Sequence, residues 1–361
     1  MRPSATVFAA SLFLGLLAGI MACGSVGSSG TESPPAASVP SSVPSVPPVP
    51  ADPCPDGTAV VDLSAAESAP LSLRADSGFV YWISADTSGA APQRRVRRAP
   101  LRGGSPETLY STSKELGSLE LSGDDVVLLE SNSAGGGALL LLPKAGGAPA
   151  VVETFPTRTS VDPFGLAVDD TSFYWLTHDS GTSLGHSVWA RSRDGGTTRR
   201  LGRVTLPFDQ SLGGMRADRD HLYWMLASGI VLRIAKSGGA VERIVDDGDG
   251  IGGWDLTDSA VVYAALAAGG PLRSVSKAGG ATTSLGDVLM ARYAVAAGEL
   301  GVAFATMHND LGLLRPDGAV ETLPVTGVVS TGSLLWVGHT LLWANTASVA
   351  AGGAVRRVCV R

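Results

Sequence analysis

Apolar and polar residues alternate along one ten-residue phrase of this chain, and the phrase recurs. It occupies Leu73 to Trp82, with related copies at Leu166 to Trp175, Met215 to Trp224 and, in altered form, Leu256 to Ala264. A period of two residues is typical of β-strands rather than helices. Self-similarity at regular intervals predicts a repeat architecture built from such strands.

A second element follows each phrase: a short run of apolar and basic residues, a glycine turn and another apolar run. Arg233 to Ala240 is the clearest copy, with Gly238 and Gly239 at the turn. Glycine tolerates the positive backbone angles of tight hairpin turns. Each repeat is therefore predicted to contain four short strands.

The spacing of the copies predicts their number. The position of Tyr81 recurs at intervals of 39 to 49 residues, at Val127, Tyr174, Tyr223, Tyr263, Ala303 and Leu342. Four-stranded blades of β-propellers are about 40 to 50 residues long. We predict an all-β, seven-bladed β-propeller in which the Tyr-Trp pairs pack between blades. A six-bladed ring, with one weak copy as an insertion, is the alternative.

The two ends of the chain predict how the ring closes. The last repeat supplies three strands, and Pro55 to Leu63 resembles the fourth strand of the other repeats. We expect this N-terminal strand to complete the last blade with the C-terminal strands, which leaves no open sheet edge at the seam. Cys54 would then face Cys359. We predict a disulfide between them, with two unpaired buried thiols as the alternative.

The first residues have the character of an export signal, because an apolar stretch too short for a membrane span ends at Ala22. With Ile20 three places before Cys23 and a small residue just before it, the segment resembles a bacterial lipoprotein signal. The resemblance implies removal of residues 1–22 and acylation of Cys23. The residue after Cys23 is Gly24 and not the aspartate that is associated with inner-membrane retention. The resemblance therefore also implies an outer-membrane anchor in the cell envelope. Ordinary secretion is the alternative.

Residues 23–53 are predicted to form a disordered tether. They are mostly Ser, Pro, Val, Gly and Ala, with Glu32 and Asp52 as the only charges. Such a segment cannot bury enough apolar surface to fold. The remaining residues, 54–361, suffice for one propeller domain and are too few for a second sizeable domain.

Composition excludes some function classes. The net charge of −6 gives no overall attraction to nucleic acid, and the three cysteines and five histidines form no cluster with zinc-ligand spacing. The Gly-Gly pairs recur with the repeats as turns, so none is read as a phosphate-binding loop. We expect a monomer that uses no cofactor and binds no nucleic acid.

The Tyr-Trp phrases resemble the blades of the low-density-lipoprotein-receptor class of propeller and, more loosely, the propeller lipoproteins of bacterial envelopes. Tyr81, Tyr174 and Tyr223, each followed by Trp, carry the likeness. The Thr-Asp that follows Tyr-Trp in the receptor class is replaced here, by Ile83-Ser84 after the first pair. The resemblance implies the fold, and fold alone does not imply function.

Four aspartates recur with the phrase, at Asp76, Asp169, Asp218 and Asp258. They stand at a strand end before a turn, where Asp side chains commonly bond the backbone of the turn. We interpret them as turn caps. A ring of carboxylates around a central metal is the alternative.

The densest acidic segment, Asp246 to Gly253, offers one metal candidate. Counted from Asp247, the carboxylates of Asp247, Asp249 and Asp258 fall at places 1, 3 and 12 and a glycine falls at place 6, which partly matches a calcium loop. Ile251 stands at a ligand place, and no flanking helices are expected. A flexible inter-blade loop is the favoured interpretation, with calcium binding as the weaker alternative.

Two further groups contain residue types that are used in binding or catalysis. The basic run Arg94 to Arg98 alternates about Val96 and is interpreted as the solvated face of a strand, with lipid phosphates or an acidic partner as the alternative. His178 and His186 flank a loop of the third blade, but no nucleophile is identified beside them. We therefore assign no catalytic residue.

The sequence favours a membrane-anchored scaffold that binds an envelope protein or a polysaccharide through propeller loops. Inter-blade loops are the usual contact surface of propellers, and three candidate loops are Phe155 to Gly165, Leu206 to Gly214 and Asp246 to Trp254. The alternative is a propeller hydrolase or lyase. It requires three or more His, Asp or Glu side chains converging at the channel mouth, whereas small or apolar residues there favour binding.

Overall fold

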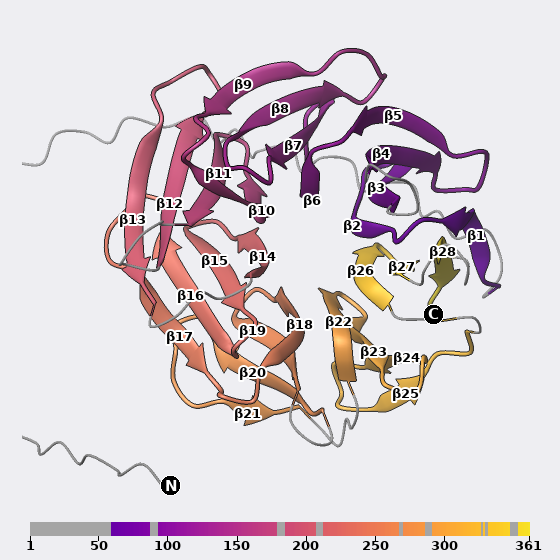
Figure 1. The fold of residues 1–361 in the computed structure, drawn as a ribbon. Coiled ribbons are helices and arrows are strands. Elements are labelled where there is room, and N and C mark those ends of the chain that lie inside the picture. Colours follow the sequence, from indigo (N-terminus) through magenta and orange to yellow (C-terminus); the bar gives the residue numbers. More distant parts are fainter. Residues whose placement is uncertain are drawn as a thin grey trace, which may run out of the picture. The chain divides into compact units, whose positions relative to one another are not determined.

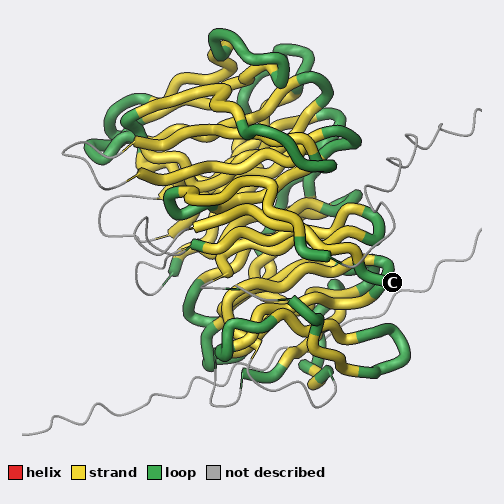
Figure 2. The backbone as a smooth tube through the Cα atoms, turned by 90° about the vertical axis from the view of Figure 1, so that its right-hand side faces the viewer, coloured by secondary structure: helices red, strands yellow, loops and turns green. Residues whose placement is uncertain are grey.

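The computed structural model describes residues 59–86, 93–178, 185–206, 212–266, 270–285, 291–325, 328, 331–346 and 353–361. Strands joined by turns and loops make up these residues, as Figure 2 shows. None of the described residues forms a helix that could cross a membrane. The all-β prediction is confirmed.

Seven antiparallel sheets of four strands form the body, and we number them as blades 1 to 7 in the chain order of their innermost strands. Blades 1 to 3 consist of β2 (Leu71–Ala75), β3 (Phe79–Asp86), β4 (Gln93–Pro100) and β5 (Glu107–Thr112); β6 (Glu115–Ser122), β7 (Asp125–Ser131), β8 (Gly137–Pro143) and β9 (Ala150–Phe155); and β10 (Ser160–Val168), β11 (Ser172–His178), β12 (Gly185–Ser192) and β13 (Arg199–Thr205). Blades 4 to 7 consist of β14 (Leu212–Ala217), β15 (His221–Leu226), β16 (Ile230–Ala235) and β17 (Glu242–Asp246); β18 (Ile251–Leu256), β19 (Ala260–Ala265), β20 (Leu272–Ser276) and β21 (Thr283–Ser284); β22 (Ala291–Gly298), β23 (Gly301–Thr306), β24 (Leu311–Leu314) and β25 (Val320–Thr322); and β26 (Thr331–Val337), β27 (Thr340–Asn345), β28 (Gly353–Cys359) and β1 (Val61–Glu67).

The innermost strands close a ring. They contact one another in the order β2, β6, β10, β14, β18, β22 and β26, and β26 contacts β2 again (Figure 1). The structure is therefore a seven-bladed β-propeller, and the six-bladed alternative is wrong.

Blade 7 contains both ends of the described chain. Its strand order is β1-β28-β27-β26, and Val61 of β1 pairs with Arg357 of β28 (Figure 1). An N-terminal strand thus completes the last blade, as the sequence predicts, although β1 overlaps the predicted segment, Pro55 to Leu63, only at residues 61–63. Closure of this kind removes the exposed edge that an open ring would leave.

The Tyr-Trp pairs fill the wedges between neighbouring blades. Tyr81 packs with Leu128 and Leu140 of blade 2, whereas Trp82 packs with Leu342 of blade 7 and with Leu63. Successive residues of a strand point to opposite faces of its sheet. One Tyr-Trp dipeptide therefore packs into both interfaces between its blade and the neighbouring blades, which confirms the packing prediction.

Candidate binding site

The innermost strand of each blade lines the central channel, and each has a break in its pairing register near its start, as in a β-bulge. A bulge leaves residues unpaired and re-aims nearby side chains. Many of the residues in these breaks are small, including Ser72, Ser118, Gly214, Gly252 and Gly332. They surround the channel mouth at the end of the ring where the innermost strands begin, which we call the bulged end.

Hydrogen bonds between blades hold the bulges in place. Ser72 has a φ of 56°, in the left-handed region that residues other than glycine rarely adopt. Its Oγ accepts a hydrogen bond from the Leu119 N–H of blade 2 at 3.0 Å. The Oγ of Ser333 in blade 7 accepts one from the Leu73 N–H at 3.2 Å. These bonds maintain an unfavourable backbone at the mouth, a feature that is concentrated at functional sites.

Two arginines and two carboxylates form pairs between blades deeper in the channel. Arg74 Nε donates to Glu120 Oε2 at 2.7 Å, and Arg74 Nη2 donates to the other oxygen. Arg216 Nε lies 3.5 Å from Asp255 Oδ1. Burial alone would lower the pKa of Arg74, but the charge and hydrogen bonds of Glu120 outweigh burial and raise the pKa. Burial and the like charge of Arg74 lower the pKa of Arg216, and Asp255 offsets them only in part.

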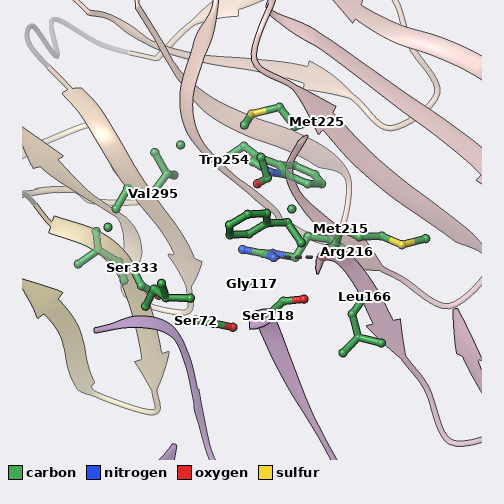
Figure 3. Close-up of a pocket in the computed structure, with 18 of the residues that line it drawn as sticks. Ser72, Gly117, Ser118, Leu166, Met215, Arg216, Met225, Trp254, Val295 and Ser333 are labelled. Carbon is green, nitrogen blue, oxygen red and sulfur yellow. Dashed lines mark hydrogen bonds between the residues drawn. The ribbon is translucent and has the colours of Figure 1, made fainter. Parts of the chain in front are cut away.

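A cavity of about 270 Å³ connects the mouth with Arg74, Glu120 and Arg216. Figure 3 shows the Arg216 side chain reaching into it, with Trp254 on one side and Ser72 and Ser118 on the other. The Arg216 guanidinium carbon lies 5.5 Å from the centroid of the Trp254 ring. Phe164 also lines the cavity and is 43% exposed. The site therefore combines the Arg216 cation and the Arg74–Glu120 ion pair with aromatic walls and a rim of small residues.

Sequence reasoning missed the channel arginines, although a signal was present. Arg74 and Arg216 lie directly opposite Tyr81 and Tyr223 in the strand pairing, where the third blade has Ala167. Directly paired residues share one face of a sheet. This position can hold an apolar residue, as Ala167 shows. A cation at the same position could therefore have marked Arg74 and Arg216 as functional.

The recurrent aspartates lie at the opposite end of the ring from the bulged end, and three of them are turn caps as predicted. Asp76 Oδ1 accepts the N–H groups of Gly78 and Phe79 at 3.0 and 2.9 Å. Asp76 Oδ2 accepts the Tyr81 hydroxyl at 3.0 Å and lies 3.0 Å from the Lys144 ammonium of blade 2. The same clamp joins blade 3 to blade 4 and blade 4 to blade 5, through Asp169, Tyr174 and Lys236 and through Asp218, Tyr223 and Lys277.

The fourth aspartate does not share this role. Thr257 caps the turn of blade 5, because its Oγ1 accepts the Ala260 N–H at 3.0 Å. The alignment of Asp258 with the other three aspartates was therefore wrong by one residue. The sequence places Thr257 directly before Asp258, and both residue types cap turns.

The calcium candidates Asp247 and Asp249 lie together, but a guanidinium joins them. Arg273 Nη1 donates to Asp247 Oδ1 and, at 3.0 Å, to Asp249 Oδ2. Burial would raise the pKa of Asp247, but the bonds from Arg273 and Tyr263 keep it below its usual value. Among the described residues, no three His, Cys, Asp or Glu side chains are grouped as a metal site. Calcium would have to displace Arg273.

The basic run lies on β4 as expected, but its side chains are engaged within the fold. The pairs are Arg94 with Glu115, Arg97 with Glu67, and Arg98 with Glu107. Glu67 is only 1% exposed and also accepts the Trp82 indole N–H at 3.2 Å. The run is therefore not a simple solvated face, because buried and cross-strand carboxylates bind it.

The two histidines of blade 3 are brought together by the pairing of β11 with β12. The rings of His178 and His186 are perpendicular, with centroids 4.8 Å apart. His178 Nε2 lies 2.6 Å from Asp162 Oδ2, and Asp162 Oδ1 accepts the Phe164 N–H at 2.8 Å. Asp162, which sequence reasoning did not include, thus links the histidines to the exposed aromatic at the channel mouth.

Several predicted features fall outside the described residues, namely the signal, the tether, Cys23 and Cys54. Residues 207–211 of the Leu206 to Gly214 loop also lie outside them. Cys359 is buried at the end of β28. Its disulfide with Cys54 stays a prediction.

Comparison with known proteins identifies the fold. The sequence matches no known family and no curated protein. Among solved structures, the computationally designed Ika8 protein is 14% identical with a TM-score of 0.53 over 84% of this chain and 100% of its own. A prolyl endopeptidase is 11% identical with a TM-score of 0.54, over 82% of this chain and 50% of its own. Sqt1 from Saccharomyces cerevisiae is 10% identical with a TM-score of 0.52, over 77% of this chain and 83% of its own. These likenesses agree with a β-propeller and carry no function across.

Proposed function

We propose that this protein is a scaffold that binds a partner protein at the bulged end of its propeller, and that a lipid holds it in a bacterial envelope membrane. One observation carries the proposal: of the five large apolar side chains that are exposed among the described residues, those of Phe164, Leu266 and Met307 lie at that end, whereas Val151 and Val320 lie on the outermost strands β9 and β25. Phe164, Leu266 and Met307 are 43%, 45% and 48% exposed. Leu266 follows the end of β19, and Met307 follows the end of β23. These strand ends pair with the starts of β18 and β22, and therefore belong to the bulged end.

The channel mouth also supports binding over hydrolysis. Small and apolar residues form most of the cavity lining, and the one carboxylate in it, Glu120, is paired with Arg74. A hydrolase or lyase needs a base or nucleophile that can reach a substrate. In the described lining, no set of three His, Asp or Glu side chains converges to supply one, and the blade 3 group of Asp162, His178 and His186 does not line the cavity. Exposed apolar side chains around such a mouth suit a protein partner.

The anchor rests on the sequence alone. Removal of residues 1–22 would leave Cys23 as the acylated N-terminus of a tether that ends at Pro53. Two or more acyl chains hold a protein far more firmly than one. Metabolic labelling with palmitate should mark the wild-type protein in the outer-membrane fraction and not the Cys23→Ser variant. Label on both proteins would refute acylation at this cysteine.

Closure by Cys54 and Cys359 is part of the same proposal. β1 and β28 are antiparallel neighbours in blade 7, and Val61 at the start of β1 pairs with Arg357, two residues before Cys359. Peptide mapping without reductant should find the two cysteines in one linked fragment. A free Cys54 thiol in exported protein would contradict the pairing.

Site-specific photocrosslinking tests the docking face. A photoreactive residue at Phe164 should give a discrete adduct in cells, whereas the same residue at Val320, which is 45% exposed on the outermost strand β25, should not. The adduct is identified by mass spectrometry, and the purified partner is then titrated with wild-type protein and with Phe164→Ser. Equal adducts from both positions, or equal affinity of the two proteins, would refute docking at the bulged end.

A further inference from the structure

The two channel arginines differ in how fully their donors are used. Arg74 donates through Nε and Nη2 to Glu120 and through Nη1 to the Leu73 carbonyl at 2.7 Å. Arg216 donates through Nη1 to the Met215 carbonyl at 3.1 Å. Its other partner is Asp255, 3.5 Å from Nε, and the Arg216 side chain is 33% exposed. A guanidinium carries five N–H donors in a fork that matches a carboxylate.

Two backbone hydrogen bonds orient Asp255 beside Arg216. Its Oδ1 accepts the Leu256 N–H at 2.9 Å, and its Oδ2 accepts the Ala297 N–H of blade 6 at 3.0 Å. These backbone bonds fix the carboxylate, so its distance of 3.5 Å from Arg216 Nε is set by the scaffold. The lowered pKa of Arg216 agrees with a cation whose charge is incompletely compensated.

The residues around Arg216 indicate which other group could neutralise the charge of its guanidinium. The Trp254 ring lies against the guanidinium, and Phe164, Leu71 and Met225 add apolar surface to the same cavity. The Ser72 and Ser118 side chains lie across the pocket from Trp254 (Figure 3). At about 270 Å³ the cavity is just below the usual lower limit for small-molecule sites, about 300 Å³. It suits one aromatic ring with a short acid chain.

We propose that the channel binds a small aromatic monocarboxylate, with its carboxylate on Arg216 and its ring against Trp254 and Phe164. A single negative charge fits better than a doubly charged phosphate, because Glu120 and Asp255 lie next to the same arginines and repel excess negative charge. This ligand site goes beyond the protein-docking function and does not depend on it.

Calorimetry on the full-length protein in detergent tests the site. The probes are benzoate, phenylacetate and 3-phenylpropionate, each compared with its neutral amide and with phenylphosphonate. We expect at least one carboxylate to bind with a Kd below about 1 mM. Its amide and the phosphonate should bind about tenfold more weakly or worse. Absence of heat with all three carboxylates, or equal binding of acid and amide, overturns the proposal.

Two variants assign the contacts. Arg216→Gln should weaken the carboxylate at least about tenfold and leave the amide unchanged. The matched control is Arg315→Gln, which removes an arginine paired with Glu321 on the outer strands and should leave binding unchanged. Phe164→Ala, at a position that is 43% exposed, should weaken the binding of aromatic acids several-fold and leave the binding of acetate, which has no ring, unaffected. Equal loss from Arg216→Gln and Arg315→Gln would overturn the assignment, as would unchanged binding in Arg216→Gln. Loss of the ligand with intact crosslinking at Phe164 would separate this site from the docking face.

Discussion

Replacing Lys277 with Met should loosen the clamp between blades 4 and 5. The Lys277 ammonium lies 3.1 Å from Asp218 Oδ2 and 5.8 Å from the centroid of the Tyr223 ring. Burial alone would raise the pKa of Asp218, but the His221 N–H and Lys277 lower it to about 2. Met keeps the apolar stem over the ring and removes the charge.

The expected cost follows from that pKa. A fall from 3.8 to about 2 corresponds to about 2 kcal/mol, shared between the lysine and backbone donors. Solvent contact screens the pair and reduces the share of the lysine to about 0.5 kcal/mol, and its contact with the ring adds about 0.5 kcal/mol. We expect Lys277→Met to lower the free energy of unfolding by about 1 kcal/mol at pH 7.

Urea denaturation of Lys277→Met, Asp218→Asn and the double variant measures the coupling between the two residues. Because the folded-state pKa of Asp218 is depressed, its contribution is present above pH 3.8 and lost as the pH falls through about 2. The cost of Lys277→Met should therefore stay constant from pH 7 to 5 and shrink below pH 3. Arg243→Met, which breaks an exposed pair with Asp246, should cost less than about 0.5 kcal/mol. Strictly additive single changes, or an equal cost for Arg243→Met, would refute the clamp.

Three further outcomes are expected. The Arg357 side chain is buried, and its one hydrogen bond among the described residues is to Cys359 Sγ at 3.5 Å, so Arg357→Met should leave the free energy of unfolding unchanged or raise it by about 1 kcal/mol; a clear loss in urea would contradict this. A Cβ at Gly298 would lie 2.7 Å from the Trp336 ring, so Gly298→Ala should cost about 1–3 kcal/mol by thermal denaturation, and a neutral effect would disprove the tight contact. Burial and a neighbouring carboxylate raise the pKa of Tyr110 and Tyr263 to about 12, so the folded state holds these protons more tightly and stability should fall as the pH rises from about 10 to about 12; an unchanged urea midpoint between pH 9 and 11.5 would count against it.

The sequence by itself determined the blades and their closure. Alternation of apolar and polar residues specifies a strand, and the glycines of the turns specify hairpins, because both depend on neighbours within a few residues. Repetition then counts the blades, and the resemblance of Pro55 to Leu63 to a fourth strand identifies the seam. The buried Tyr and Trp of each phrase were also predictable, since alternate residues of a strand face opposite blades.

Only the tertiary structure decided the site. The bulges depend on how two strands pair. The alternation of apolar and polar residues along one strand does not show where that pairing breaks. Arg74 forms an ion pair with Glu120, and Lys277 forms one with Asp218, in each case between neighbouring blades. These residues are too far apart in the sequence for a local pattern to predict their contact. How closely a carboxylate neutralises a guanidinium depends on differences in distance of less than 1 Å, as the 2.7 Å between Arg74 Nε and Glu120 and the 3.5 Å between Arg216 Nε and Asp255 show. Packing between blades sets those distances.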